Sequence, residues 1–247
     1  MPVETTTAQA EAFFGRMIDA VSPWAERLGE LFSDSDDAAG SPTRRSIDAV
    51  VEPLAMRLLT VDAPDLVGAG FVAAAGVMAD ARWHMAWWQG ARAERLQIDE
   101  EDAAGEAYAR REWFARPMEQ GISHLTGPYV DFLCTDEYTV TVTVPVVRNG
   151  RSLGVVGADV LAATLEESLG RQLRLVSPGA ALLNSHSRVI VSADPTLAAG
   201  TLLLPGLGGA GPADAAATAP GAEPERTDAG MLHRAASLGI SVLVPHG

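Results

Sequence analysis

Residues that could bind a small molecule gather between Arg111 and Asp159 of this 247-residue chain. They form three motifs: RxWF at 111–114, PYVD at 128–131 and GVVGAD at 154–159. An arginine holds a carboxylate through two parallel hydrogen bonds, and an indole N–H beside it adds a further donor. A phenol and carboxylates suit an ammonium group. The stretch therefore offers groups for both ends of a zwitterion.

Arg111 and Trp113 stand two residues apart, so they would share one face of an extended segment and could grip an acidic group together. The alternative is structural: Arg111 pairs with Glu106 or Glu112 on the surface, and Trp113 belongs to the core. Because surface ion pairs are common, the spacing alone favours this second arrangement.

Tyr129 and Asp131 are also two residues apart and could both face an ammonium group. Against this, Gly127-Pro128 is a turn signal, and Asp131 could simply satisfy turn amides. Asp159 ends an apolar strand, where the alternative to a ligand contact is a helix N-cap. Taken by itself, Asp159 fits the N-cap better than a ligand contact, whereas both interpretations stay open for Asp131.

Three tryptophans, Trp83, Trp87 and Trp88, lie close together in the sequence WHMAWWQ. Aromatic faces attract cations, so they could wall a ligand site. A tryptophan-lined core is the alternative, since large aromatic side chains dominate protein cores.

No catalytic constellation accompanies these residues. The five histidines show no metal-ligand spacing, Cys134 is the single cysteine, and no phosphate-binding loop is present. We therefore predict no metal, no cofactor and no enzymatic activity. An enzyme acting on a similar small molecule is the alternative, and it would need Asp131, Asp159 or His124 as a general base with a raised pKa.

The composition is that of a globular protein, with 47% hydrophobic and 20% charged residues. A net charge of −14 disfavours direct nucleic-acid binding, because an acidic surface repels phosphate backbones. The N-terminus lacks a basic and apolar leader, and no apolar run is long enough to span a membrane. These features predict a soluble cytoplasmic protein without membrane contact.

The hydrophobic periodicity predicts the elements that must position these residues. Two helices come first, over residues 8–32 and about 41–58, with Ser41-Pro42 capping the second and Pro23 interrupting the first. The apolar stripe of the first helix consists of Phe13, Met17, Val21, Trp24, Leu28 and Leu31. The later elements are strands at 66–78, 83–89 and 95–98, a helix at 108–118, a hairpin at 138–160, a helix at 161–173, and strands at 180–191 and 231–245.

This order predicts an α+β fold with an antiparallel sheet. The run 138–147 alternates valine with threonine, which is typical of a half-buried strand, and Asn149-Gly150 is a strong hairpin signal. The Gly-, Ala- and Pro-rich stretch at 205–230 predicts a flexible loop, and the acidic run at 33–40 predicts a solvated loop rather than a calcium site.

In sequence order, RxWF, PYVD, the TVTVPV strand, the Asn149-Gly150 turn and GVVGADV resemble the Cache sensor fold. Cache domains are the PAS-like sensing domains of chemoreceptors and sensor kinases. The resemblance extends from about Leu66 to Leu204, where ALLNSHSRVIVSADPTLAAGTLL resembles the opening of the second module in double-Cache proteins. It implies N-terminal helices over 1–62, a ligand-binding module over 63–176 and a shortened second module over 177–247.

One class of this family binds amino acids and related amines. The resemblance places Arg111 and Trp113 at the ligand carboxylate, and Tyr129, Asp131 and Asp159 at the ammonium group.

Two aromatic positions differ from the pattern of that class. Phe114 stands where the class usually has a tyrosine, so one hydroxyl hydrogen bond is missing. Trp87 or Trp88 would replace a second tyrosine, expected upstream of the arginine.

The resemblance therefore implies a small-molecule sensor whose ligand is an amino acid, an amine or a small carboxylate. The chain carries no kinase, cyclase or methyl-accepting segment, so such a sensor would stand alone and signal through a regulatory partner protein. The front helices could also form a homodimer, although a helical stripe is more often core. The alternatives are the enzyme above and an interaction scaffold without a ligand.

Overall fold

The computed structural model describes residues 2–32, 40–97, 102–130, 136–204, 223–235 and 237–246. Helices at the front of the chain precede two antiparallel sheets, so the predicted α+β class is confirmed. The described chain divides into two compact units. One comprises residues 17–124 and 141–160, and the other comprises 1–16, 125–140 and 161–247. The boundaries predicted at residues 62 and 176 stay a prediction.

The two front helices are α1 (Val3–Gly29) and α2 (Arg44–Arg57). α1 continues through Pro23 as one helix, and its stripe buries Phe14 completely in place of the predicted Phe13. α2 begins after Thr43, whose hydroxyl accepts a hydrogen bond from the Ser46 amide, so the prediction that Ser41-Pro42 caps this helix was wrong. A π-helical turn at Leu58–Asp62 then leads into the first strand.

A six-stranded sheet has the order β3-β2-β1-β6-β5-β4. Its strands are β1 (Leu66–Ala73), β2 (Met85–Gln89), β3 (Glu94–Arg95), β4 (His124–Val130), β5 (Tyr138–Arg148) and β6 (Arg151–Leu161). β4 was not predicted, because Gly127-Pro128 indicated a turn, whereas in the structure this pair lies inside the strand with a cis peptide bond. The helix predicted at 108–118 is two helices, α3 (Asp102–Ala109) and α4 (Glu112–Gln120).

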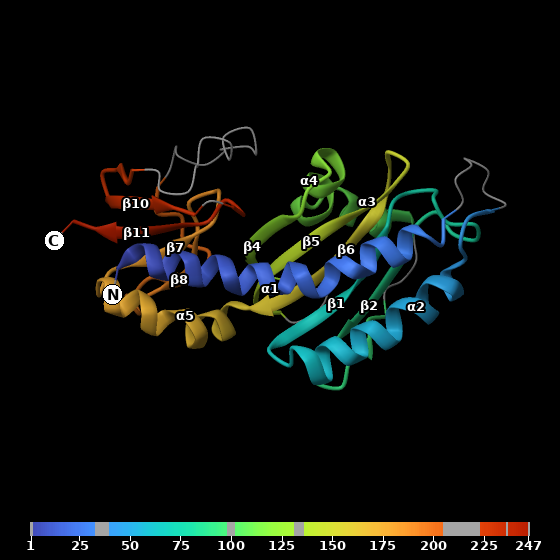
Figure 1. Ribbon diagram of the computed structural model, residues 1–247, viewed down its shortest axis with the longest axis horizontal. Coiled ribbons are helices and arrows are strands. Elements are labelled where there is room, and N and C mark those ends of the chain that lie inside the picture. The colour runs from blue at the N-terminus through green and yellow to red at the C-terminus, as the bar shows by residue number, and fades with distance from the viewer. Residues whose placement is uncertain are drawn as a thin grey trace. The chain divides into compact units, whose positions relative to one another are not determined.

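The centre of this sheet decides which side chains share a face. On β1, Gly68 lies opposite Gln89 of β2 and Asp159 of β6, and β1 pairs with both strands in antiparallel register. Residues directly opposite each other in a sheet project on the same side. Trp87, two residues from Gln89, therefore projects on the face that carries Asp159. Helix α2 packs along β1 and β2 (Figure 1).

The predicted β5–β6 hairpin is confirmed, with positive φ angles of 50° at Asn149 and 78° at Gly150. Such angles at both turn residues match the twist of the flanking strands. The prediction that β5 is half-buried was wrong. Thr139, Thr141 and Thr143 are all buried, as are the neighbouring valines, so both faces of this strand are covered.

The other unit contains a five-stranded sheet with the order β8-β7-β11-β10-β9. Its elements are α5 (Ala162–Val176), β7 (Ala181–Leu183), β8 (Val189–Ser192), β9 (Glu225–Arg226), β10 (Gly230–Arg234) and β11 (Ser241–Pro245). Helix α5 packs on β8 (Figure 1), and aliphatic side chains such as Leu183, Val189 and Leu243 form the core. The predicted helix and final hairpin are confirmed. The flexible loop predicted at 205–230 lies largely outside the described residues, which omit 205–222. Its described end, from residue 223, contains strand β9. The acidic loop also lies outside the described residues, apart from Gly40.

Candidate functional site

Asp159 lies in β6 and is buried, with 4% of its surface exposed. The hydroxyl of Thr141 on β5 donates a hydrogen bond of 2.6 Å to its Oδ1 atom. The N-cap of α5 is Leu161, so Asp159 does not cap that helix. Its carboxylate is thus held by a charge-assisted hydrogen bond inside the sheet.

Glycines on β1 allow the neighbouring side chains to approach the sheet closely. A Cβ atom added to Gly68 would lie 2.7 Å from Nε1 of Trp87 and 3.0 Å from Oδ2 of Asp159. A Cβ atom at Gly70 would lie 2.8 Å from Cε3 of the same indole. The indole ring therefore rests on glycine backbone, and its N–H group lies close to the carboxylate.

Three polar atoms at this place are buried and have no hydrogen-bond partner among the described residues: Nε1 of Trp87, Oε1 of Gln89 and Oγ1 of Thr143. A Cβ atom at Gly157 would lie 3.0 Å from the Thr143 methyl and 3.4 Å from the Trp87 ring, so both side chains are on this face. Buried polar atoms in native proteins almost always have partners. Such a concentration is typical of a site whose partner is a ligand or water.

Arg111 is the N-cap of α4 and is exposed. In the described part of the chain its side chain makes no ion pair. The two acidic residues proposed as surface partners are engaged elsewhere: Oε1 of Glu112 lies 2.9 Å from Nε2 of His124, and Glu106 pairs with arginines other than Arg111. The structure thus leaves the Arg111 guanidinium available to an external carboxylate.

Tyr108, Trp113, Phe114 and Trp83 form one aromatic cluster. Tyr108 stacks on Trp113, with ring centroids 6.2 Å apart and planes 27° apart, and it contacts Phe114 and Trp83 edge-on at 5.8 and 5.5 Å. Phe114 is buried among these rings. The sequence interpretation did not assign Tyr108 to the site, although its position three residues before Arg111 is a signal that could have done so.

The structure does not show Tyr129 or Asp131, the other two residues predicted to bind the ammonium group, together with Asp159. Tyr129 lies on β4 and is half-buried, in the unit that contains residues 125–140. Asp131 lies outside the described residues.

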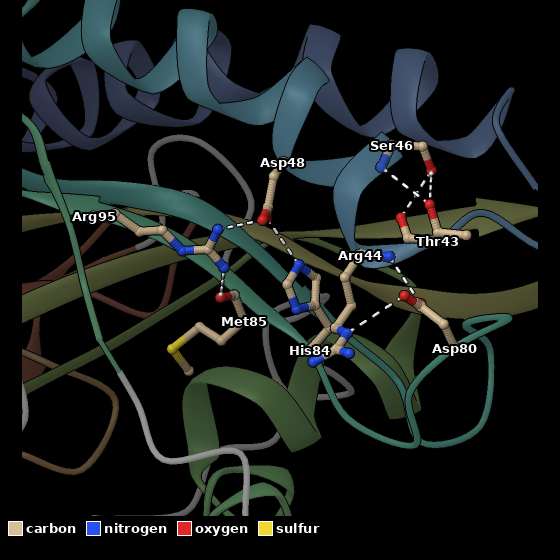
Figure 2. A network of polar contacts seen from close by, with 8 residues as sticks. All are labelled: Thr43, Arg44, Ser46, Asp48, Asp80, His84, Met85 and Arg95. Atoms are coloured by element: carbon tan, nitrogen blue, oxygen red, sulfur yellow. Dashed lines mark hydrogen bonds and ion pairs between the residues drawn. The ribbon is translucent and has the colours of Figure 1, made fainter.

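Trp88 projects from the opposite face to Trp87, because adjacent strand residues alternate. There the guanidinium of Arg95 lies 5.4 Å from the centre of its ring. Figure 2 shows how Arg95 and His84 both reach Asp48 on α2. Nε2 of His84 lies 2.9 Å from Oδ1 of Asp48, and the Arg95 guanidinium contacts the other carboxylate oxygen. The structure therefore places Trp88 in the contact between sheet and helix, away from Asp159.

Asp48 is the titratable residue at the centre of this network. Burial of its carboxyl group raises the pKa, but the hydrogen bonds and charges of His84 and Arg95 outweigh this effect and hold the pKa of Asp48 below its usual value of 3.8. The ionised carboxylate thus ties α2 to the start of β2 and to β3.

Within the ranges that the structure describes, no group of three or more His, Cys, Asp or Glu side chains is arranged to hold a metal ion. No helix in those ranges combines the length and apolar character needed to cross a membrane.

Comparisons with known proteins agree with this architecture. Residues 79–167 match the family described as methyl-accepting chemotaxis protein-like, first PDC sensor domain. A search of curated protein sequences found no match.

Several solved structures are similar over nearly the whole chain. The ligand-binding domain of the Campylobacter jejuni chemoreceptor Tlp3 in complex with L-valine has a TM-score of 0.62 and 10% identity, covering 99% of this chain and 89% of that one. The ligand-binding domain of the Pseudomonas aeruginosa PAO1 amino acid chemoreceptor PctC in complex with GABA has a TM-score of 0.56 and 18% identity, covering 97% and 93%. An extracellular domain assigned to a histidine kinase, mmHK1S-Z3, has a TM-score of 0.64 and 13% identity, covering 96% and 89%.

Residues 79–167 are therefore similar to the first PDC sensor domain of chemoreceptor-type proteins, and the chain has the PDC (Cache) fold. The matched family is one of sensors rather than enzymes.

Proposed function

We propose that this chain is a small-molecule sensor that binds an amino acid or a related amine over the sheet face carrying Asp159 and Trp87, and that it signals through a partner protein. The observation that supports it best is the buried Asp159 carboxylate, set beside an indole N–H that has no partner within the described residues. The Thr141 hydroxyl and the Trp87 indole lie at this carboxylate, and a polar site of this kind supports a ligand over a scaffold without one.

The ammonium group of the ligand would pair with Asp159. A buried carboxylate already oriented by Thr141 needs little rearrangement to accept from a cation, and a tryptophan ring beside it favours positive charge. The assignment of Tyr129 and Asp131 to the ammonium group rests on the sequence resemblance alone.

The carboxylate of the ligand would bind Arg111, whose guanidinium has no acidic partner among the described side chains, and the indole N–H of Trp113, two residues further along the chain. The structural neighbours solved with L-valine and GABA support this class of ligand, because both molecules join an ammonium group to a carboxylate. Phe114 brings a buried ring without a hydroxyl to this end, which would change the preferred ligand relative to members that have a tyrosine there.

A thermal-shift screen with amino acids, amines and small carboxylates, followed by calorimetry, tests the proposal. A ligand at one hundred times its dissociation constant stabilises the folded state by about 2.7 kcal/mol, which raises the melting temperature by about 5–10 °C for a chain of this size. Asp159→Asn should weaken binding of that ligand by about 10- to 100-fold, the value of a charge-assisted hydrogen bond.

Asp65→Asn is the matched control, because Asp65 is exposed just before β1 and should leave affinity unchanged. Absence of any stabilising compound would argue against a small-molecule sensor. A ligand that binds Asp159→Asn as tightly as the wild type would remove Asp159 from the site.

The partner, a cytoplasmic location and a homodimeric state are parts of the proposal that rest on the sequence alone. Affinity purification with and without ligand, cell fractionation, and light scattering would test them in turn.

A further inference from the structure

The turn between β5 and β6 joins an asparagine to a glycine, a pair that loses ammonia readily without an enzyme. The backbone nitrogen of the glycine attacks the side-chain carbonyl carbon of the asparagine, and a glycine has no side chain to hinder the approach. The chain has two asparagines, Asn149 and Asn184, and only Asn149 precedes a glycine. The structure places these two residues in opposite surroundings.

Asn149 and Gly150 are both exposed at the tip of the hairpin. A Cβ atom added to Gly150 would have no atom within 4 Å beyond its chain neighbours, so the peptide group between the two residues has room to rotate. Ring closure needs this rotation out of the two-residue turn, whose φ angles are 50° and 78°. The tip of a hairpin opens at a lower free-energy cost than the strands of a core, so the reaction proceeds through the opened turn.

Asn184 is 8% exposed, and both ends of its amide are held. Its Nδ2 atom donates a hydrogen bond of 2.6 Å to the carbonyl of Gly127. Its Oδ1 atom accepts hydrogen bonds of 2.9 Å from the backbone amides of His186 and Arg188. Turning this side chain toward the nitrogen of Ser185 would break all of these bonds, so Asn184 serves as an internal control.

We propose that Asn149 is a site of spontaneous modification, at which the chain converts to an aspartyl and an isoaspartyl form. The nitrogen of Gly150 gives its proton to solvent and forms a bond to Cγ of Asn149. The Cγ–Nδ2 bond breaks, and the amide nitrogen leaves as ammonia with a proton taken from solvent. Water then opens the cyclic imide. Breaking its Cγ–N bond gives aspartate, and breaking the bond between the nitrogen and the main-chain carbonyl carbon gives isoaspartate.

The two products affect the hairpin differently. Both carry a carboxylate where the amide stood, but only in isoaspartate does the main chain run through Cγ, which lengthens the turn by a carbon atom. A two-residue turn with positive φ angles matches the twist of the flanking strands, and a longer turn loses this match. Isoaspartate at position 149 therefore loosens the start of β6, the strand that carries Asp159.

The purified full chain is incubated in mildly alkaline buffer beside a synthetic peptide of residues 146–153. Mass spectrometry follows both, with electron-based fragmentation to distinguish isoaspartate from aspartate. We expect conversion at Asn149 about tenfold more slowly than in the peptide, because the turn must open first, and an intact Asn184 in the same sample. Asn149→Gly keeps a favoured Gly-Gly turn and should show no conversion at this position.

The effect on the hairpin has its own readout. Asn149→Asp supplies the charge without the longer main chain, so it is the matched control for the isoaspartyl fraction isolated by chromatography. The melting temperature of that fraction should lie about 2–4 °C below that of Asn149→Asp for a chain of this size. Equal melting temperatures would refute the effect on the hairpin.

The assignment of the site stands or falls on the two asparagines and needs no ligand. It is overturned if Asn149 stays intact over about a hundred half-times of the peptide reaction, a delay that only a core segment would impose. Conversion of Asn184 as fast as Asn149 would overturn it as well, since burial and hydrogen bonding would then not decide which asparagine reacts.

Discussion

Replacing Asp48 with alanine is expected to destabilise the contact between α2 and the sheet more than its partly exposed position suggests. Asp48 is the shared acceptor for two side chains distant in sequence, His84 and Arg95 (Figure 2). An ionised carboxylate can only accept, so Nε2 of His84 carries the proton of that hydrogen bond. The substitution leaves both donors without their acceptor.

The magnitude follows from how exposed each donor is. The His84 side chain is 1% exposed, so water cannot replace the lost acceptor, and a buried unsatisfied donor costs about 1–3 kcal/mol. The Arg95 side chain is 32% exposed and can be rehydrated in part, which limits its share to about 0.5–1 kcal/mol. We expect a loss of about 2–3 kcal/mol and a fall in melting temperature of about 5–10 °C.

Chemical denaturation and calorimetry measure this loss directly. Glu52→Ala is the matched control, because Glu52 lies one turn further along α2 and is exposed, and its removal should change stability by less than about 0.5 kcal/mol.

The pH dependence gives an independent check on the charge of Asp48. Its pKa is lowered in the folded state, so its contribution is fully present above the usual value of 3.8 and is lost as the pH falls through the folded pKa. The stability difference between the wild type and Asp48→Asn should therefore shrink as the pH falls below about 3.8. Equal stability of Asp48→Ala and Glu52→Ala, or a difference that does not shrink below pH 3.8, would refute this reasoning.

Two further substitutions test the face that carries Asp159. Thr141→Val keeps the side-chain shape but removes the 2.6 Å hydrogen bond to the carboxylate, and urea denaturation should give a loss of about 1–3 kcal/mol; no loss would mean that this bond is not formed. Gly70→Ala forces a methyl group against the indole and the β2 backbone, with an expected cost of about 1–3 kcal/mol, whereas Gly15→Ala on α1, with no atom within 4 Å of the new methyl, should add up to about 1 kcal/mol of stability. Similar melting temperatures for these two alanine variants would contradict the close approach of the indole to Gly70.

Much of the fold could be predicted because its signals are local. The apolar spacing in α1 and α2 follows the helical period, and Asn149-Gly150 favours a two-residue hairpin whatever surrounds it. The order of helices and strands then predicted an antiparallel α+β fold. β4 was missed for the same reason, because the local signal of Gly127-Pro128 indicates a turn, and only pairing with β5 keeps it extended.

The sequence predicted which residues belong to the candidate site, but not which face of the sheet each of them occupies. The strand pattern implies that Trp87 and Trp88 project to opposite sides, but not which side α2 covers. That choice depends on Asp48 and its two partners. His84 lies 36 residues and Arg95 lies 47 residues further along the chain, so no helical or strand periodicity predicts these contacts. The separation of one tryptophan toward Asp159 and the other toward α2 is therefore a property of the tertiary structure.

The partner of Asp159 illustrates the same limit most clearly. The two-residue turn at Asn149-Gly150, continued without a break, would place Val140 opposite Asp159. The observed hydrogen bond joins Asp159 to Thr141, so the two strands are offset by one residue. Valine and threonine have nearly the same shape, and both faces of β5 are buried, so the alternating pattern could not decide between the two registers. The sequence by itself determined that a hairpin forms and that it ends in a carboxylate. Packing against β1, where glycines admit the indole of Trp87, decided which hydroxyl meets that carboxylate.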